Sequence, residues 1–422
     1  MRSLTYSELI RGNRDFRNLL AGQFISELGN WFNFIAALGL VRLVSDASPL
    51  AAGLFFVARL IPFAIMSPIA GTFVDRFSRR QVMVVTDVAR TVIALAFLFV
   101  KDPNDLWIAY MATILLHTLG AFFDGAKNAA APNLTGREGL LAGTALLFST
   151  KFLLMAVGSA LGGWASAAFG YQVAFIINAA SFLISAYTVW LIPEDAVKEK
   201  AADDTTERRT FLSDLKEGFV YSVKNHFALT ILIMNMIWAT GGGAINVIFE
   251  RLGGVYYAET EGWNPDVAVA ILWTATGFGI TLGMMIAHRT SIWLDRSGKH
   301  RSFIGWTLIA HGLIFAIGGF VPTLWLFTIL IFASRAVVGV EYAVQETLFQ
   351  RSLPDQIRGR ISTLDRGAEM TVFGISTFAA SELMYYITPQ TLTYASGILS
   401  AFAGVVWFIR ERTKTTTGQP WD

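Results

Sequence analysis

Long apolar runs constrain this sequence more than any other feature. A helix needs about 20 apolar residues to cross the hydrocarbon core of a bilayer. Continuous runs of this length are typical of transmembrane helices, whereas the strands of a membrane β-barrel are short and alternate in polarity. We predict twelve spans, at roughly 18–41, 51–71, 82–100, 106–126, 140–168, 172–192, 227–249, 267–287, 302–320, 323–347, 363–386 and 391–409.

The predicted spans fall into two sets of six, with a polar stretch between them. We therefore expect an all-α membrane protein with two pseudo-symmetric six-helix bundles, at 1–192 and 218–422, joined by a cytoplasmic linker at 193–217. The linker contains the segment EDAVKEKAADDTTERR. Such a charged, water-loving segment favours the role of a simple tether.

The composition argues against a soluble protein, an enzyme and a nucleic-acid-binding protein. Charged residues make up 15% of the 422 residues and hydrophobic residues 54%, whereas soluble domains contain about 25% charged residues. The chain has no cysteine, its five histidines are scattered, and neither a nucleophile motif nor a phosphate loop occurs. We expect no enzyme, no catalytic residue, no metal site and no cofactor. The net charge of +2 is too small to indicate a nucleic-acid partner.

Positive charges gather at the ends of alternate spans, which predicts the orientation of the chain. The longest loop on the opposite side, 252–266, carries Glu259, Glu261 and Asp266. By the positive-inside rule we place both termini and the linker in the cytoplasm of a multi-pass inner (plasma) membrane protein. The segment 18–41 is too long for the core of a signal peptide, so we expect it to remain as a helix.

A segment is repeated between the two halves. GTFVDRFSRR (71–80) follows the second predicted span, and SIWLDRSGKH (291–300) follows the eighth. A second echo, at 133–143 and 352–362, implies nearly the same offset. Repeats of six spans are typical of transporters built from two bundles that rock against each other.

The first of these segments resembles the cytoplasmic signature of the major facilitator superfamily, Gly-x-x-x-Asp-Arg-x-Gly-Arg-Arg/Lys. Ser78 stands where the family usually has Gly, and the second copy has Ser291 at the leading Gly. The resemblance covers the whole chain in span number, linker position and repeat. It implies the major facilitator fold and a gating cluster that latches the outward-open state; alternatively, the cations only fix topology. The implied gating residues are Gly71, Asp75, Arg76, Arg79, Arg80, Asp295, Arg296 and Lys299.

Shorter segments are similar to the macrolide-efflux and enterobactin-exporter branch of that superfamily. They read ARLIPF (58–63), AFFDGAKNAAAPNL (121–134) and LPDQIRGRIS (353–362). This resemblance implies export of small amphiphilic molecules. The chain departs from the antiporter motif Gly-Pro-x-x-Gly-Gly, because GSALGG (158–163) has Ser159 at the proline position. Its glycines still predict close helix packing.

Ionisable residues inside the predicted spans are candidates for function, because burying charge in a bilayer is costly. Gln23, Glu27 and Asn30 form one polar stripe at spacing i, i+4, i+7. Glu27 is the best single candidate for proton coupling. Arg59 and Lys151 reach a similar depth. The alternative is that Glu27, Arg59 and Lys151 form a static ion-pair cluster that joins three spans.

In the second half, polar residues occur on several spans. Asn246 follows the run GGG at 241–243, which should loosen or break its helix. Arg335 lies deep, and Glu341 follows on the same span. Two pairs at spacing i, i+3 favour structural or gating roles: Asp124 with Lys127, and Arg366 with Glu369. The candidate coupling and cavity residues are Glu27, Asn30, Arg59, Lys151, Asn246, Arg335 and Glu341.

Three functions are compatible with these features. The first is proton-coupled export of small amphiphilic or drug-like molecules, as in a multidrug antiporter. The second is a lipid or lysophospholipid flippase, or an importer, of the same fold. The third is a non-transporting receptor or scaffold, against which the intact motifs and the deep charges argue. We expect a small amphiphilic substrate or lipid, protons and the bilayer as partners, a proton gradient as the energy source, and a monomer.

Overall fold

The chain folds into helices throughout the part that can be described. The computed structural model describes residues 4–74, 77–197 and 211–412. Over these ranges every regular element is a helix and no strand occurs, which confirms the predicted all-α class. Two compact units are present, Met1–Glu207 and Arg208–Asp422.

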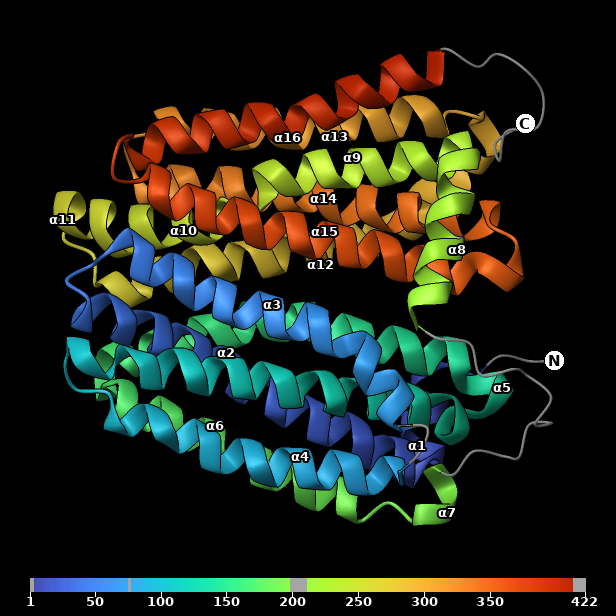
Figure 1. Cartoon of the computed structure of the whole chain (residues 1–422), viewed down its shortest axis with the longest axis horizontal. Coiled ribbons are helices and arrows are strands. Elements are labelled where there is room, and N and C mark those ends of the chain that lie inside the picture. Colours follow the sequence, from blue (N-terminus) through green and yellow to red (C-terminus); the bar gives the residue numbers. More distant parts are fainter. Residues whose placement is uncertain (1–3, 75–76, 198–210, 413–422) are drawn as a thin grey trace. The chain divides into compact units, whose positions relative to one another are not determined.

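The first unit is built from the helices at the N-terminal end of the sequence, coloured blue to green in Figure 1. One of them, α5, contains Gly136 at a φ of 63°, outside helical geometry, so α5 supplies two separate membrane-spanning segments. The elements are α1 (Tyr6–Gly12), α2 (Arg14–Val44), α3 (Pro49–Val74), α4 (Arg79–Ala94), η1 (Leu95–Phe99), η2 (Pro103–Asp105), α5 (Leu106–Phe169), α6 (Tyr171–Trp190) and α7 (Glu194–Val197).

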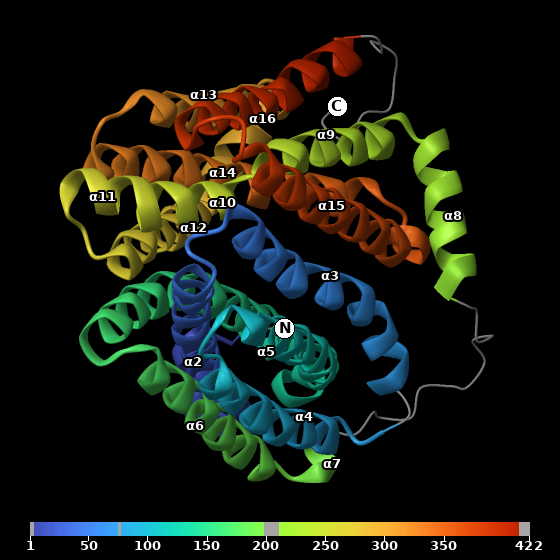
Figure 2. The ribbon, with the colours of Figure 1, turned by 60° about the vertical axis from the view of Figure 1, so that its left-hand side comes forward.

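The second unit runs from green to red in Figures 1 and 2. Its first long helical segment is interrupted at Gly243 and Ala244, between α9 and α10, where the run of three glycines predicts a break. The elements are α8 (Phe211–Lys224), α9 (His226–Gly242), α10 (Ile245–Arg251), η3 (Leu252–Tyr257), α11 (Ala258–Glu261), α12 (Pro265–Ser297), α13 (His300–Ile317), η4 (Gly318–Phe320), α14 (Leu324–Ser352), α15 (Asp355–Leu383) and α16 (Pro389–Arg412).

Most of the long helices have the composition of membrane spans. Within the described ranges, eleven helical segments are long and apolar enough to cross a bilayer. The remaining long helix, α15, has 29 residues but is more polar, and Asp365, Arg366 and Glu369 lie in its middle. These segments and α15 correspond to the twelve predicted spans.

One loop predicted from the sequence is wrong. The expected outer loop at 252–266 is helical as far as Glu261, through the π-helical segment η3 and α11. The buried side chains of Leu252 and Tyr257 give this stretch a packed face, which a loop would lack. The expected linker at 193–217 contains α7 and the first residues of α8, which begins at Phe211; positions 198–210 of that linker lie outside the described residues.

Glycines bring neighbouring helices of the first unit into close contact. A Cβ atom on Gly158 of α5 would lie 2.6 Å from the Cβ of Trp31 on α2, and one on Gly162 would lie 3.0 Å from the Cα of Phe32. Real side chains do not approach this closely, so only glycine fits at this crossing. The segment GSALGG therefore packs α5 onto α2, as its glycines predict.

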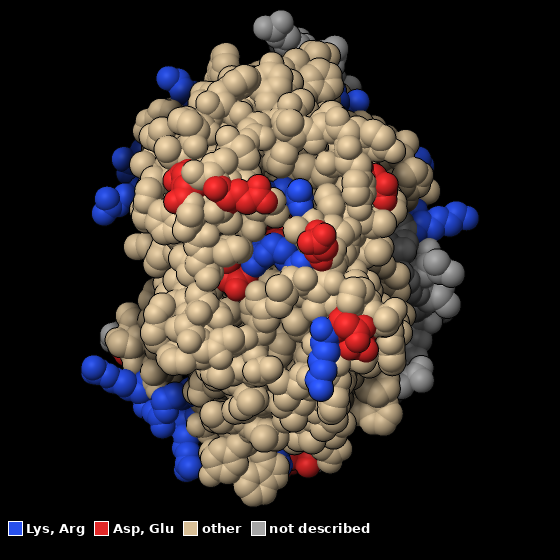
Figure 3. All heavy atoms as spheres, turned by 90° about the vertical axis from the view of Figure 1, so that its left-hand side faces the viewer, with Lys and Arg blue, Asp and Glu red and all other residues tan. Residues whose placement is uncertain are grey.

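The outer surface of the helices is strongly apolar. Val92, Met285 and Ile375 are 69%, 74% and 62% exposed. Such apolar side chains are stable in hydrocarbon and would be costly in water. Figure 3 shows a different surface, the helix ends on the left-hand side of Figure 1, where basic and acidic side chains lie in small groups among uncharged ones.

Candidate functional site

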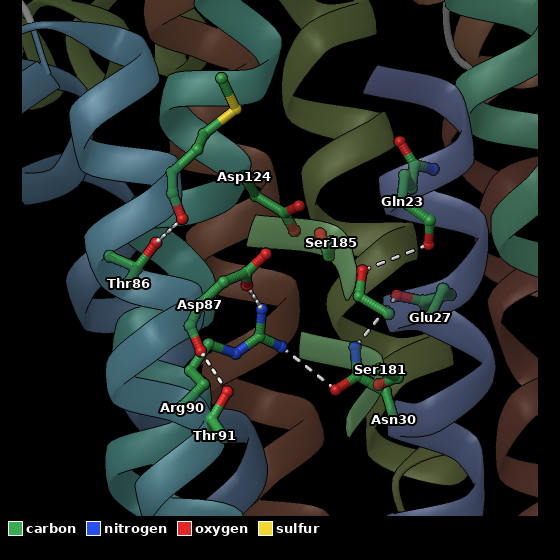
Figure 4. Close-up of polar contacts among 12 residues, drawn as sticks. Gln23, Glu27, Asn30, Thr86, Asp87, Arg90, Thr91, Asp124, Ser181 and Ser185 are labelled. Atoms are coloured by element: carbon green, nitrogen blue, oxygen red, sulfur yellow. Dashed lines mark hydrogen bonds and ion pairs between the residues drawn. The ribbon is translucent and has the colours of Figure 1, made fainter. Parts of the chain in front are cut away.

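A chain of polar side chains connects α2 to α4 inside the first unit (Figure 4). Nη2 of Arg90 donates to Oδ1 of Asn30 over 3.1 Å, and Nη1 of Arg90 lies 3.1 Å from Oδ1 of Asp87. The amide nitrogen of Asn30 donates in turn to Oε2 of Glu27 over 3.3 Å. We call Glu27, Asn30, Arg90 and Asp87 the α2–α4 polar chain. It holds two carboxylates and one cation within a single bundle.

The α4 end of this chain is deeply buried. Asp87 is fully inaccessible and Arg90 is 6% exposed. The guanidinium carbon of Arg90 lies 4.0 Å from the centre of the Phe182 ring, an arrangement that favours a cation. Among the described residues, Oδ2 of Asp87 has no hydrogen-bond partner. Ser185 on α6 is close enough to the Asp87 carboxylate to interact with it, so this end of the α2–α4 polar chain has another polar neighbour where an unpaired charge is costly.

Asp87 and Arg90 are absent from our sequence-based site, although both lie in the predicted span 82–100. Their spacing of i, i+3 allows a pair on one helix face, and two ionisable residues in one span are unusual. That signal could have identified the pair. The contact of Arg90 with Asn30 could not be predicted, because it depends on how α4 faces α2.

The other predicted members of the N-terminal site lie apart from this chain of contacts. Arg59 on α3 places its guanidinium carbon 4.0 Å from the Phe34 ring centre and 5.1 Å from that of Trp31. It is close enough to Glu27 for electrostatic attraction, but no ion pair joins the two in the described part of the chain. Lys151 is exposed on α5 and lies within electrostatic range of Asp124.

Asp124 forms an ion pair with Lys127 on the same helix. This is the contact that their i, i+3 spacing permits. Arg366 and Glu369, which have the same spacing, form no ion pair among the described residues, and the guanidinium carbon of Arg366 lies 5.4 Å from the centre of the Tyr342 ring.

The second unit has its own polar cluster, which joins α9, α14 and α15. Asn235 donates to both carboxylate oxygens of Asp365 over 3.1 and 2.9 Å, and accepts from Nε2 of Gln345 over 2.9 Å. The predicted site residue Glu341 is 5% exposed, and its Oε1 has no hydrogen-bond partner among the described residues. We did not identify Asp365 from the sequence, although we singled out its neighbour Arg366.

Two further predicted residues of the second unit have local partners. Asn246 donates to the hydroxyl of Thr377 over 3.1 Å, and that hydroxyl donates to the carbonyl of Gly243 over 2.8 Å. The contact fastens α15 to the interruption between α9 and α10. Arg335 is buried, with its guanidinium carbon 5.6 Å from the centre of the Phe315 ring.

The first copy of the repeated motif, 71–80, contacts the ends of neighbouring helices. Nη1 of Arg79 donates to the carbonyls of Ala129 on α5 and Val197 on α7, over 3.1 and 3.2 Å. Arg80 lies over the Trp190 ring at 5.8 Å. Ser78, the departure from the family pattern, caps α4 by accepting from the amide of Gln81. The motif begins at Gly71, in the last turn of α3, and Asp75 and Arg76 lie outside the described residues.

The second copy of the motif lies where α12 turns into α13. Oδ1 of Asp295 is 3.1 Å from Nε2 of His300 and 3.5 Å from Nη1 of Arg351 on α14. The ammonium of Lys299 lies 6.0 Å from the centre of the Trp293 ring. Arg296 is exposed. Asp295 therefore ties the α12–α13 turn to α14, within the second unit.

Comparison with known proteins decides the family. The Major Facilitator Superfamily matches residues 19–291, more than half of the chain. The chain belongs to the Major Facilitator Superfamily. The resemblance found in the two copies of the repeated motif is thereby confirmed, and the chain is a multi-pass membrane transporter of a small-molecule substrate rather than an enzyme.

Individual superfamily members extend the similarity over most of the chain. The MFS-type transporter YfiS of Bacillus subtilis (strain 168) is 26% identical over 412 residues, which cover 96% of this chain and 95% of that protein. Macrolide efflux protein A of Enterococcus faecalis is 21% identical over 316 residues, covering 72% and 92%. The crystal structure of the nucleoside transporter NupG has a TM-score of 0.66 at 13% identity and covers 96% and 100%, so it shares the fold.

Proposed function

We propose that this superfamily member exports small amphiphilic molecules in exchange for protons. The similarity to macrolide efflux protein A supports the direction and the substrate class. The α2–α4 polar chain carries the proposal of proton coupling, because coupling needs a carboxylate inside the bundle whose protonation can change. We place both termini in the cytoplasm, the protein in the inner membrane, and a monomer as the working unit.

Glu27 is the member of the α2–α4 polar chain that we assign as the proton carrier. Its hydrogen bond comes from a neutral amide, whereas Asp87 already faces a guanidinium. A proton on Glu27 removes one negative charge and makes its carboxyl group a donor. Because Asn30 binds both Glu27 and Arg90, it can pass this change on to Arg90.

The repeated cytoplasmic motifs are the proposed gates of the transport cycle. Rocking of two bundles exposes a site to each side of the membrane in turn. The contacts of Arg79 and Asp295 fix helix ends within each unit, and we expect them to keep the motif residues in position for gating. In this proposal Asp75 and Arg76 complete the first gate, to which Arg80 adds positive charge. Arg296 and Lys299 add positive charge to the second gate.

Transport into everted membrane vesicles tests the proposal. We expect vesicles that contain the wild-type chain to accumulate a radiolabelled macrolide when their lumen is acidified. A proton uncoupler should abolish this uptake. Glu27→Gln should lower the proton-driven uptake at least about tenfold, because the amide cannot take up a proton.

Glu138→Gln is the matched control, because Glu138 is an exposed carboxylate on α5 outside the α2–α4 polar chain. It should transport like the wild type. Uptake that is unchanged by the uncoupler would overturn the proposal of proton coupling. A normal proton dependence in Glu27→Gln would show that Glu27 is not the proton carrier. It would not contradict the proposal of export.

A further inference from the structure

A groove on the side of the second unit has no assigned role. Its volume is about 380 Å³, and it lies between α12, α13 and α14. Trp293 forms one wall from α12, and Phe303, Trp306 and Ala310 form the other from α13, with Val337 of α14 contributing to the lining. The groove therefore belongs to one unit, and its shape depends on neither the first unit nor the linker.

The walls of this groove are apolar and open to the outside. Trp293 and Trp306 are 52% and 64% exposed. Both α12 and α13 are long and apolar enough to span the membrane, so the groove opens toward the bilayer rather than toward bulk water. An apolar groove of this size in a lipid-facing surface fits an acyl chain. The acyl chain would supply the van der Waals contacts that the groove walls lack when the groove is empty.

One end of the groove carries positive charge. Lys299 lines the groove, and its exposed ammonium lies 6.0 Å from the Trp293 ring. Tryptophan with lysine at a helix end is typical of the level at which lipid head groups lie. The turn is further flanked by Arg296 and Arg301.

The acidic residue of this turn is already engaged. Asp295 lies 3.5 Å from Nη1 of Arg351 and 3.1 Å from Nε2 of His300, so Arg351 compensates part of its negative charge near Lys299. In addition, α13 begins at His300 without a side-chain cap among the described residues, which leaves amide groups directed toward any anion at that end.

We propose that this groove binds one acyl chain of an anionic phospholipid from the bilayer, with the lipid phosphate held by Lys299. Basic pockets between spanning helices are suited to acidic head groups. A zwitterionic lipid would bring its own cation next to Lys299, so the charge of the site favours a lipid with a net negative head group. The proposal does not depend on export or on proton coupling.

Native mass spectrometry of the purified full chain, titrated with phosphatidylglycerol or phosphatidylethanolamine, tests this site. The wild type should retain one phosphatidylglycerol more tightly than phosphatidylethanolamine. Lys299→Gln should weaken phosphatidylglycerol about fivefold, as expected for one lysine near a charged head group, and leave phosphatidylethanolamine unchanged. Ala310→Phe, which fills the groove, should weaken both lipids.

Lys224→Gln is the matched control, because Lys224 is an exposed lysine of the same unit at the end of α8, away from the groove. It should bind both lipids like the wild type. Equal binding of the two lipids by the wild type would overturn the choice of an anionic lipid. Unchanged phosphatidylglycerol binding in Lys299→Gln or in Ala310→Phe, or displacement of the lipid by inorganic phosphate alone, would overturn the site itself.

Discussion

Arg90 is the residue on which the α2–α4 polar chain depends. Its guanidinium binds Asp87 on its own helix and Asn30 on α2, and an arginine cannot lose its charge in a protein. With 6% of its surface exposed, it must be compensated by these partners and by the Phe182 ring. Removing one partner of a buried pair therefore costs more than removing both.

We predict that Arg90→Met lowers the stability of the detergent-purified chain by about 3–5 kcal/mol, because it leaves Asp87 buried without a cation. The double variant Arg90→Met with Asp87→Leu should lose less than Arg90→Met alone. Denaturant unfolding followed by tryptophan fluorescence would measure these two variants and the single variant Asp87→Leu, which together complete a double-mutant cycle. Lys101→Met, at an exposed position, serves as the control. A double variant that loses the sum of the two single losses would argue against the pair.

At this scale the sequence predicts a contact only where the two partners lie close together along one helix. The polar stripe of Glu27 and Asn30 is a local pattern along one helix, so the sequence predicts it. The partner of Asn30 lies 60 positions away, on α4, and only helix packing brings it close. Arg59 has the right depth for Glu27, but its position over the rings of α2 depends on a rotamer that spacing along the chain does not determine.

At the scale of elements, close helix crossings shape the second unit. A Cβ atom on Gly283 of α12 would lie 2.8 Å from the Cα of Gly339 on α14. Small residues on both helices let the two backbones approach, which is the usual way for membrane helices to gain packing energy. The same helices carry Trp293 and Val337 of the lipid groove, so this crossing also sets the width of that groove.

We predict that Gly283→Ala destabilises the chain by about 1–3 kcal/mol, because the added methyl group must push α12 away from α14. Gly359→Ala is the matched control, since a Cβ there would meet no atom within 4 Å. In a helix that change should be neutral or slightly stabilising. Thermal unfolding in detergent compares the two variants. Equal stability of both would show that the crossing tolerates a side chain.

The sequence predicts the existence of the elements better than their ends. Apolar runs of about 20 residues mark the part of a helix that lies in hydrocarbon, but helical hydrogen bonding continues into polar sequence. For this reason α12 extends to Ser297, ten residues beyond the predicted span end at 287. The glycine run at 241–243 predicted a loosened helix, because glycine weakens a helix locally; helical assignment is interrupted at Gly243 and Ala244, although both keep right-handed helical dihedral angles.

At the scale of the whole molecule, the distribution of charge over alternate loops predicts an orientation. Cations concentrate beside one set of helix ends, and both copies of the repeated motif belong to that set. The positive-inside rule then places α8 and the α12–α13 turn in the cytoplasm, and the η1–η2 connection and α11 outside. Because the chain contains no cysteine, single cysteines can report this orientation without background.

We predict that Lys101→Cys and Thr260→Cys react with a membrane-impermeant maleimide in intact cells, whereas Lys224→Cys and Arg296→Cys react only after the cells are opened. All four positions are exposed in the structure, so a difference in labelling would reflect the side of the membrane rather than burial. Opening the cells supplies the control that each thiol is reactive. The reverse pattern would invert the orientation and, with it, the direction of proton-driven transport that we propose.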